Sequence, residues 1–239
     1  GMEASLGAIA AAASIHPAHH MPVIAAPIVT DATILDEAAS KALLQPYGLD
    51  LPQNLVVKRQ ALPDTLPFGY PVVLKAMGQA HKTEIGGVKV GLADHAELEA
   101  AMVEMDQPFY LIEEMVRDGL AELLVGVVAD SSHGYLLTLA AGGVLTEILK
   151  DSVSLSLPVE EPDILTALEK LKIAPLLAGY RGKPAVDKAA LVTAVLAVQD
   201  CVLDNRASFS EIELNPLILT PTRAVAVDAL IKTGGKSRG

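Results

Sequence analysis

Three oxygen-bearing side chains near the end of the chain have the spacing of a metal site. The stretch EIELNP places Glu213 and Asn215 two residues apart, and hence on one side of a strand. The apolar run AVAVDAL then contains Asp228, whose charge is costly to bury without a partner. A hairpin that closes near residues 220–222 would bring it beside the other two. Two carboxylates and an amide oxygen suit Mg²⁺, whereas the ordinary alternative is a strand-end aspartate that hydrogen-bonds the turn.

A lysine within an apolar stretch is a second candidate. Lys75 lies in PVVLKAM, which has the composition of a buried strand. A compact positive charge at this place suits the oxygens of a nucleotide phosphate. The alternative is a lysine on an edge strand, whose stem covers apolar surface while the ammonium reaches solvent.

The segment HKTEIGGVKVG, residues 81–91, combines a histidine with a glycine pair. Neutral imidazole is a nucleophile near pH 7, so His81 is a candidate for covalent catalysis, although a lone loop histidine is usually an ordinary exposed residue. Gly86 and Gly87 would let backbone N–H groups approach a phosphate, but most such pairs only form turns. A second pair at 142–143 fits a ligand-facing loop and a plain turn equally well.

The elements that must position these residues are strands mixed with helices. Thr33 and Gly48 are the expected caps of a first helix, and Pro162 begins a later one. Two further helices are predicted over 94–105 and 187–205. The second has a buried face formed by Leu191, Ala194, Val195, Val198 and Val202. Strands are predicted over 54–60, 71–77, 87–93, 109–115, 121–129, 134–142, 211–219 and 224–231, with a hairpin turn at 130–134. Strict βαβ alternation is lacking, which predicts an α+β fold.

Composition excludes several classes of function. The chain has 239 residues, 51% of them hydrophobic, and a net charge of −11, so a general nucleic-acid surface is not expected. No apolar run approaches the roughly 18–20 residues of a membrane span. Its one cysteine, Cys201, fits a reducing compartment, and we expect a cytoplasmic protein. Residues 1–30, rich in Ala, Pro and His, are expected to form a flexible extension.

Several motifs occur together in one order: YPVVLKA, HKTEIGGVKVGL, LIEEMV, AELLVGVVAD, AGGVLTEILKD, GYRGKPAVD and EIELNPL with AVAVDALI. Together they resemble the ATP-grasp domain of the NDP-forming acyl-CoA synthetases. The β subunit of the ADP-forming acetyl-CoA synthetases is most similar, and succinyl-CoA synthetase β chains are more distant. The resemblance implies a domain over 31–236 in which two α+β subdomains clamp a nucleotide. The smaller, lid subdomain would cover about 54–115, and the larger one 31–53 plus 116–236.

The resemblance also implies roles for individual residues that bind the nucleotide. Lys75 would reach the phosphates of ATP or ADP. The backbone around Glu113, Met115 and Val116 would face the adenine, and Glu122 would lie near the sugar. The Mg²⁺ ligands would be Asn215 and Asp228, with Glu213 close by.

The chemistry that the resemblance implies is phosphoryl transfer through a phosphohistidine. His81 would carry the phosphoryl group, Glu84 would orient its imidazole, and Lys82 would hold the phosphate. Acyl-CoA and phosphate would form an acyl phosphate on a CoA-binding, α-type partner subunit, because the sequence shows no CoA-binding domain. Two departures, DSSHG in place of a DPxFGP-like turn and AAGG in place of GxGG, leave substrate-side details open. The alternatives are an ATP-grasp carboxylate ligase without phosphohistidine and a non-catalytic nucleotide-sensing subunit.

Overall fold

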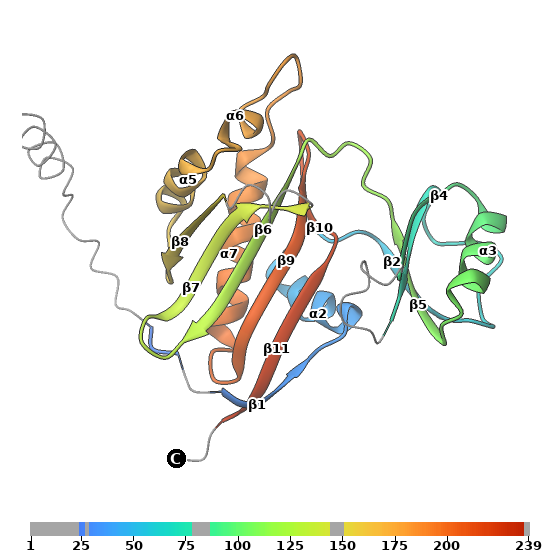
Figure 1. Ribbon diagram of the computed structural model, residues 1–239, viewed down its shortest axis with the longest axis horizontal. Helices are drawn as coiled ribbons and strands as arrows, with labels where there is room; N and C mark the ends of the chain where they lie inside the picture. The colour runs from blue at the N-terminus through green and yellow to red at the C-terminus, as the bar shows by residue number, and fades with distance from the viewer. Residues whose placement is uncertain (1–23, 27–28, 78–86, 144–150, 237–239) are drawn as a thin grey trace, which may run out of the picture.

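The computed structural model describes residues 24–26, 29–77, 87–143 and 151–236 as two antiparallel sheets with helices packed on them (Figure 1). The candidates His81, Lys82, Glu84 and Gly86 lie outside these residues, as does most of the extension expected over 1–30. Among the helices of the described ranges, none is long and apolar enough to cross a membrane.

The larger sheet has the strand order β1-β11-β9-β6-β7-β8, and β10 pairs with β9 beside this path. Its strands are β1 (Val29–Ile34), β6 (Ala121–Asp130), β7 (Gly134–Ala141), β8 (Ser152–Ser156), β9 (Phe209–Leu219), β10 (Ala224–Ala226) and β11 (Ala229–Lys236). The predicted hairpin turn is confirmed, because Asp130 pairs with Gly134 where β6 meets β7. The longest strand, β9, lies between β6 and β11 and therefore crosses the middle of the sheet (Figure 1).

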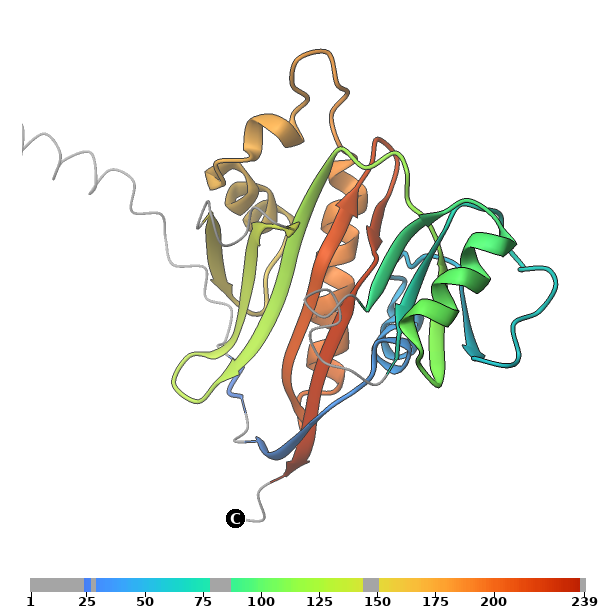
Figure 2. The same ribbon diagram turned by 45° about the vertical axis from the view of Figure 1, so that its right-hand side comes forward.

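Helices cover one face of the larger sheet, and α7 (Lys188–Asp204) packs along it behind β6 and β9 (Figures 1 and 2). The apolar face predicted for this helix is confirmed, since all five of its residues are buried in the main core. Strand β9 contributes Ile212, Leu214 and Leu217 to the same core, while Glu213 and Asn215 are only half-buried on the other side of the strand. The alternation of β9 thus places its polar residues on the face away from α7. The other helices that pack on this core are α2 (Glu37–Leu44), α5 (Glu161–Lys170) and α6 (Ala174–Leu177).

The smaller sheet has the order β2-β5-β3-β4 and a core of its own. It consists of β2 (Asn54–Lys58), β3 (Val72–Ala76), β4 (Val88–Leu92) and β5 (Phe109–Glu114), with α3 (His95–Met105) packed on one face (Figure 2). Leu74, Leu98 and Ile112 are fully buried between the sheet and α3. The predicted capping of α3 is confirmed, because the Asp94 carboxylate accepts the N–H of Glu97 at 2.9 Å.

Two chain segments connect the sheets, and they lie side by side. The N–H of Glu114, at the end of β5, donates to the carbonyl of Gln53, which precedes β2, at 2.9 Å. Asp50, on the incoming segment, forms a bidentate ion pair with Arg223 at 2.8 and 2.9 Å. The chain therefore passes from the larger sheet to the smaller one and back along two adjacent segments.

The start of the first helix differs from the sequence-based expectation. Thr33 does not cap it, because residues 29–34 form β1 and pair with β11. The N-cap is Asp36, whose side chain accepts the N–H of Ala39 at 2.8 Å. Gly48 ends the region as expected, in the left-handed conformation with φ +83°, but it follows a short 3₁₀ turn, Gln45–Tyr47, that contains Pro46. The Thr33 prediction failed because the free edge of β11 supplies hydrogen bonds that sequence periodicity does not reveal.

Three further details were not anticipated. Strand β8 and the short helix α6 have no counterpart among the predicted elements. The terminal hairpin closes as predicted, with the N–H of Thr220 donating to the carbonyl of Arg223 at 2.9 Å. Its second strand, however, is interrupted at Val227 and Asp228, which separate β10 from β11.

Candidate active site

The pairing register of β9 with β10 and β11 places Asp228 opposite Asn215, two residues from Glu213. The N–H of Asn215 donates to the carbonyl of Asp228 at 3.3 Å, and its side-chain amide donates to Glu213 at 3.2 Å. All three residues are half-buried, so their oxygens are partly shielded without being sealed from solvent. Hard oxygen donors of this kind fit Mg²⁺. Within the described ranges, no group of three or more His, Cys, Asp or Glu side chains is placed to hold a metal, and the present set relies on an amide.

The glycine pair at 142–143 lies against this set. The N–H of Gly143 donates to Oδ1 of Asn215 at 3.4 Å, and the N–H of Gly142 donates to the carbonyl of Glu122 at 2.8 Å. A Cβ at Gly142 would lie 2.7 Å from the carbonyl carbon of Leu123, so only glycine allows this approach. A Cβ at Gly143 would lie 2.0 Å from Oε2 of Glu122. The exposed Glu122 side chain therefore lies beside Gly143.

Lys75 projects from β3 of the smaller sheet toward the interruption in the larger one. Its Nζ donates to the carboxylates of Glu37 and Glu113 at 2.6 and 2.8 Å, and to the carbonyl of Val227 at 2.5 Å. The side chain is buried, so the alternative of an edge lysine that reaches solvent is wrong. Burial lowers the pKa of Lys75, but Glu37, Glu113 and Asp228 together outweigh it and raise the pKa above its usual value. The ammonium is therefore charged and lies near Asp228.

Two residues of this arrangement, Glu37 and Lys41, were missed by the sequence analysis. Both lie on α2, and both are buried. Nζ of Lys41 donates to Glu37 and to the carbonyl of Val227, each at 2.8 Å, and also forms a short contact with Glu113. The only sequence signal was the i, i+4 spacing of an acid and a lysine, which is also typical of a solvent-exposed helix face.

The residues expected at the adenine lie where β5 ends. The side chain of Glu113 is buried in the ion cluster, and its backbone lies in β5 opposite Asn54 of β2 and Val73 of β3. Met115 and Val116 are half-buried in the segment that leads to β6. Of the glycine-rich segment, Gly87 is described and buried, and its carbonyl accepts the N–H of Ala76 at 2.8 Å. The segment that contains His81 thus starts and ends at paired strands, directly after Lys75.

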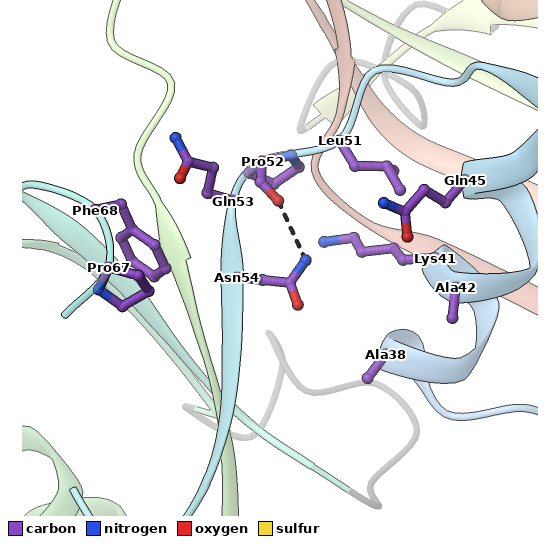
Figure 3. Close-up of a pocket in the computed structure, with 10 residues that line it drawn as sticks. All are labelled: Ala38, Lys41, Ala42, Gln45, Leu51, Pro52, Gln53, Asn54, Pro67 and Phe68. Atoms are coloured by element: carbon purple, nitrogen blue, oxygen red, sulfur yellow. Dashed lines mark hydrogen bonds between the residues drawn. The ribbon is translucent and has the colours of Figure 1, made fainter. Parts of the chain in front are cut away.

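A cavity of about 520 Å³ lies between α2 and the smaller sheet (Figure 3). Its wall combines Ala38, Lys41, Ala42 and Gln45 with residues 51–54, Pro67 and Phe68. The Asn54 amide donates to the carbonyl of Pro52 at 3.2 Å within it. Lys41 belongs both to the ion cluster and to the lining of the cavity, so the cavity adjoins the site, although none of the predicted site residues lines it.

Comparisons with known proteins agree with this architecture. A family model described as an ATP-grasp domain matches residues 28–233. Subunit beta of the ADP-forming acetate–CoA ligase II of Pyrococcus furiosus is 31% identical over 83% of this chain and 91% of its own length. A trans-feruloyl-CoA synthase from an unknown prokaryotic organism is 33% identical over 88% of this chain, which spans only 32% of that larger protein.

Solved structures give the same result. One similar structure is the dinucleotide-forming acetyl-coenzyme A synthetase 1 of Ca. Korarchaeum cryptofilum, in complex with coenzyme A and Mg-AMPPCP and with a phosphohistidine segment pointing towards the nucleotide binding site. Its TM-score is 0.72 at 29% identity, and the match covers 82% of this chain and 91% of that one. Another complex of this protein gives a TM-score of 0.77 at 28% identity, covering 84% and 93%. The predicted α+β, ATP-grasp fold is confirmed. The chain belongs to the ATP-grasp domain family, in the group that contains the β subunits of ADP-forming acetyl-CoA synthetases.

Proposed function

We propose that this chain is the nucleotide-binding subunit of an ADP-forming acyl-CoA synthetase, and that it moves a phosphoryl group between an acyl phosphate and ADP through a phosphohistidine at His81. The observation that carries the proposal is the meeting of Lys75 with the interruption at Val227 and Asp228. A cation on one sheet and an oxygen cluster on the other are what the phosphates and metal of a nucleotide need.

In this proposal the smaller sheet, residues 54–115, is the lid subdomain, and residues 31–53 with 116–236 form the larger subdomain. The nucleotide lies between them, with the phosphates at Lys75, the adenine at the backbone of Glu113–Val116, and the sugar near Glu122. Mg²⁺, held by Glu213, Asn215 and Asp228, would supply positive charge to the phosphate oxygens. Gly86 and Gly87 would cover the phosphates from the other side.

The proposed reaction has two balanced steps. The imidazole nitrogen of His81 attacks phosphorus, the bond between phosphorus and the acyl oxygen breaks, and a carboxylate leaves. An oxygen of the β-phosphate of ADP then attacks the same phosphorus, the P–N bond breaks, and ATP forms. Glu84 orients the imidazole, Lys82 steadies the phosphoryl group, and Lys75 stabilises the charge that moves onto the nucleotide.

The proposal includes a CoA-binding, α-type partner subunit that converts acyl-CoA and phosphate into the acyl phosphate. The Ca. Korarchaeum cryptofilum relative supports this by its complexes with coenzyme A and its phosphohistidine segment. The buried, unpaired Cys201 fits the reducing conditions of a cytoplasm.

Phosphoenzyme formation is the decisive experiment. We expect γ-labelled ATP with Mg²⁺ to label the protein with a bond that is labile in acid and stable in base. His81→Ala should abolish the label, whereas His133→Ala, at the exposed β6–β7 turn, should keep it. Wild-type protein that stays unlabelled even with the partner present would refute the relay. ATP consumption that requires a carboxylic acid substrate but gives no label would then indicate a carboxylate ligase. Binding of Mg·nucleotide without turnover would indicate a sensor.

A further inference from the structure

Four buried charged side chains meet where the two sheets join. Glu37 and Lys41 come from α2, Lys75 from β3 and Glu113 from β5, and their exposed fractions are 4%, 2%, 6% and 1%. Figure 3 shows Lys41 extending from α2 toward the smaller sheet. Two ammonium groups balance two carboxylates, so the cluster as a whole is neutral. Buried ions need such balance because an unpaired charge is costly away from water.

The balance matters for a polyanionic ligand. Lys75 already contacts two carboxylates, Glu37 and Glu113, and the negative charge of Asp228 acts on it as well. Without Lys41, the cluster would consist of Lys75, Glu37 and Glu113. Its net charge would be −1, and it would repel phosphate. Lys41 contacts the same two carboxylates and supplies the missing positive charge.

We propose that Lys41 and Glu37 are positioning residues for phosphate recognition: Lys41 neutralises the shared carboxylates so that the charge of Lys75 remains available to a nucleotide, and Glu37 fixes the Lys75 ammonium beside Asp228. Both act through Lys75 and need not touch the ligand. The inference rests on the proposed nucleotide site and adds the residues that set its charge.

Opposite charge changes within the one cluster test the proposal. Lys41→Met leaves the cluster at −1 and should raise the Kd for Mg·ADP roughly tenfold or more. Glu37→Gln leaves it at +1, and its amide oxygen can still accept the hydrogen bond that positions Lys75, so this variant should bind at least as tightly as wild type. Isothermal titration calorimetry at fixed ionic strength measures all three proteins, and Lys58→Met, an exposed lysine on β2, is the matched control that should not change the Kd.

The double variant separates charge from packing. Lys41→Met with Glu37→Gln restores neutrality, and we expect it to recover most of the lost affinity. A purely structural role predicts weaker binding by both single variants and no recovery in the double one, and that result would overturn the inference. If Lys41→Met fails to fold, Glu37→Gln and the double variant still test the charge-balance proposal, because weaker nucleotide binding by both would contradict it. Wild-type protein that does not bind Mg·ADP would overturn the proposed function itself, whereas a wild type that binds and a Lys41→Met variant that binds equally well would overturn only the charge-balance proposal.

Discussion

Asp228 has neighbours on both sheets. It follows β10 and precedes β11, so its backbone faces Asn215 while its charge acts on Lys75 of the other sheet. The pairing register of β9 is the same with β10 and with β11, so Asp228 lies opposite Asn215. Its charge also links it to Lys75 of the other sheet.

We predict that Asp228→Asn weakens Mg²⁺-dependent nucleotide binding. The amide keeps the shape and one oxygen but loses the charge that attracts the cation, so the Mg²⁺ concentration for half-maximal nucleotide binding should rise about tenfold or more. Titration of Mg²⁺ at constant nucleotide measures this. Glu211→Gln is the matched control, because Glu211 lies on the same face of β9 but is paired with Lys232 at 2.5 Å. An unchanged Mg²⁺ requirement in Asp228→Asn would remove this residue from the metal site.

We also predict that Cys201 is unreactive in the native protein and makes stability fall at high pH. Burial, with a smaller contribution from Asp204, raises the pKa of its thiol from 9.0 to about 11. The raised value means that the neutral thiol stabilises the fold below about pH 9, and that this stabilisation is lost as pH rises toward 11. A thiol reagent at pH 8 should modify urea-unfolded but not native protein, and urea midpoints should decline between these pH values. Rapid labelling of native protein would contradict the prediction.

At the scale of elements, sequence periodicity correctly predicted the features that depend on residues close together in the chain. The five-residue apolar face of α7 and the capping of α3 by Asp94 follow from neighbours within a few positions in the chain. The strand β1 was missed because its partner, β11, lies at the other end of the chain. Glu37 and Lys41 were missed for the same reason, since their partners Lys75 and Glu113 lie 38 and 72 positions away. The period-2 spacing of Glu213 and Asn215, by contrast, made their shared face readable.

The corrected start of α2 gives a prediction about capping. Asp36→Ala removes an acceptor for the N–H of Ala39 and should cost about 1 kcal/mol of unfolding free energy. Thr33→Ala should change it by no more than about 0.5 kcal/mol, because this exposed strand residue makes only a 3.3 Å bond to the carbonyl of Thr233. Urea unfolding of both variants measures the difference. Equal losses would contradict the assignment of the cap.

At the scale of the whole molecule, two cores meet at one polar joint. Each sheet has its own apolar cluster, and the buried ions of α2, β3 and β5 lie between them. A ligand held by both sheets should therefore couple them, because it binds only when both are in place.

Hydrogen exchange can test this coupling. We predict that Mg²⁺ with a non-hydrolysable ATP analogue slows amide exchange in β3 and, at the same time, in β9 and β11, because the ligand contacts both sheets. Helix α5, packed on the opposite face of the larger sheet, serves as the internal reference and should be unaffected. Protection confined to one of the two sheets would place the nucleotide elsewhere.

The adjacent connections between the sheets have a consequence for recombination. Gln53 and Glu114 are joined by one hydrogen bond, so the chain between them is a topological insertion whose two ends need no linker to meet. An exchange of residues 54–113 between two related proteins would move Lys75, Glu113 and the proposed carrier His81 together, and would leave the proposed metal ligands in the host.

Such a chimera would have to match across the joint. The host keeps Glu37 and Lys41 on α2, and the incoming segment brings the lysine and the glutamate that they neutralise. A segment with a different charge at either position would leave an unpaired ion in the interior of the protein. The buried charged residues therefore restrict the exchange of this insertion. The two surface connections alone would permit the exchange.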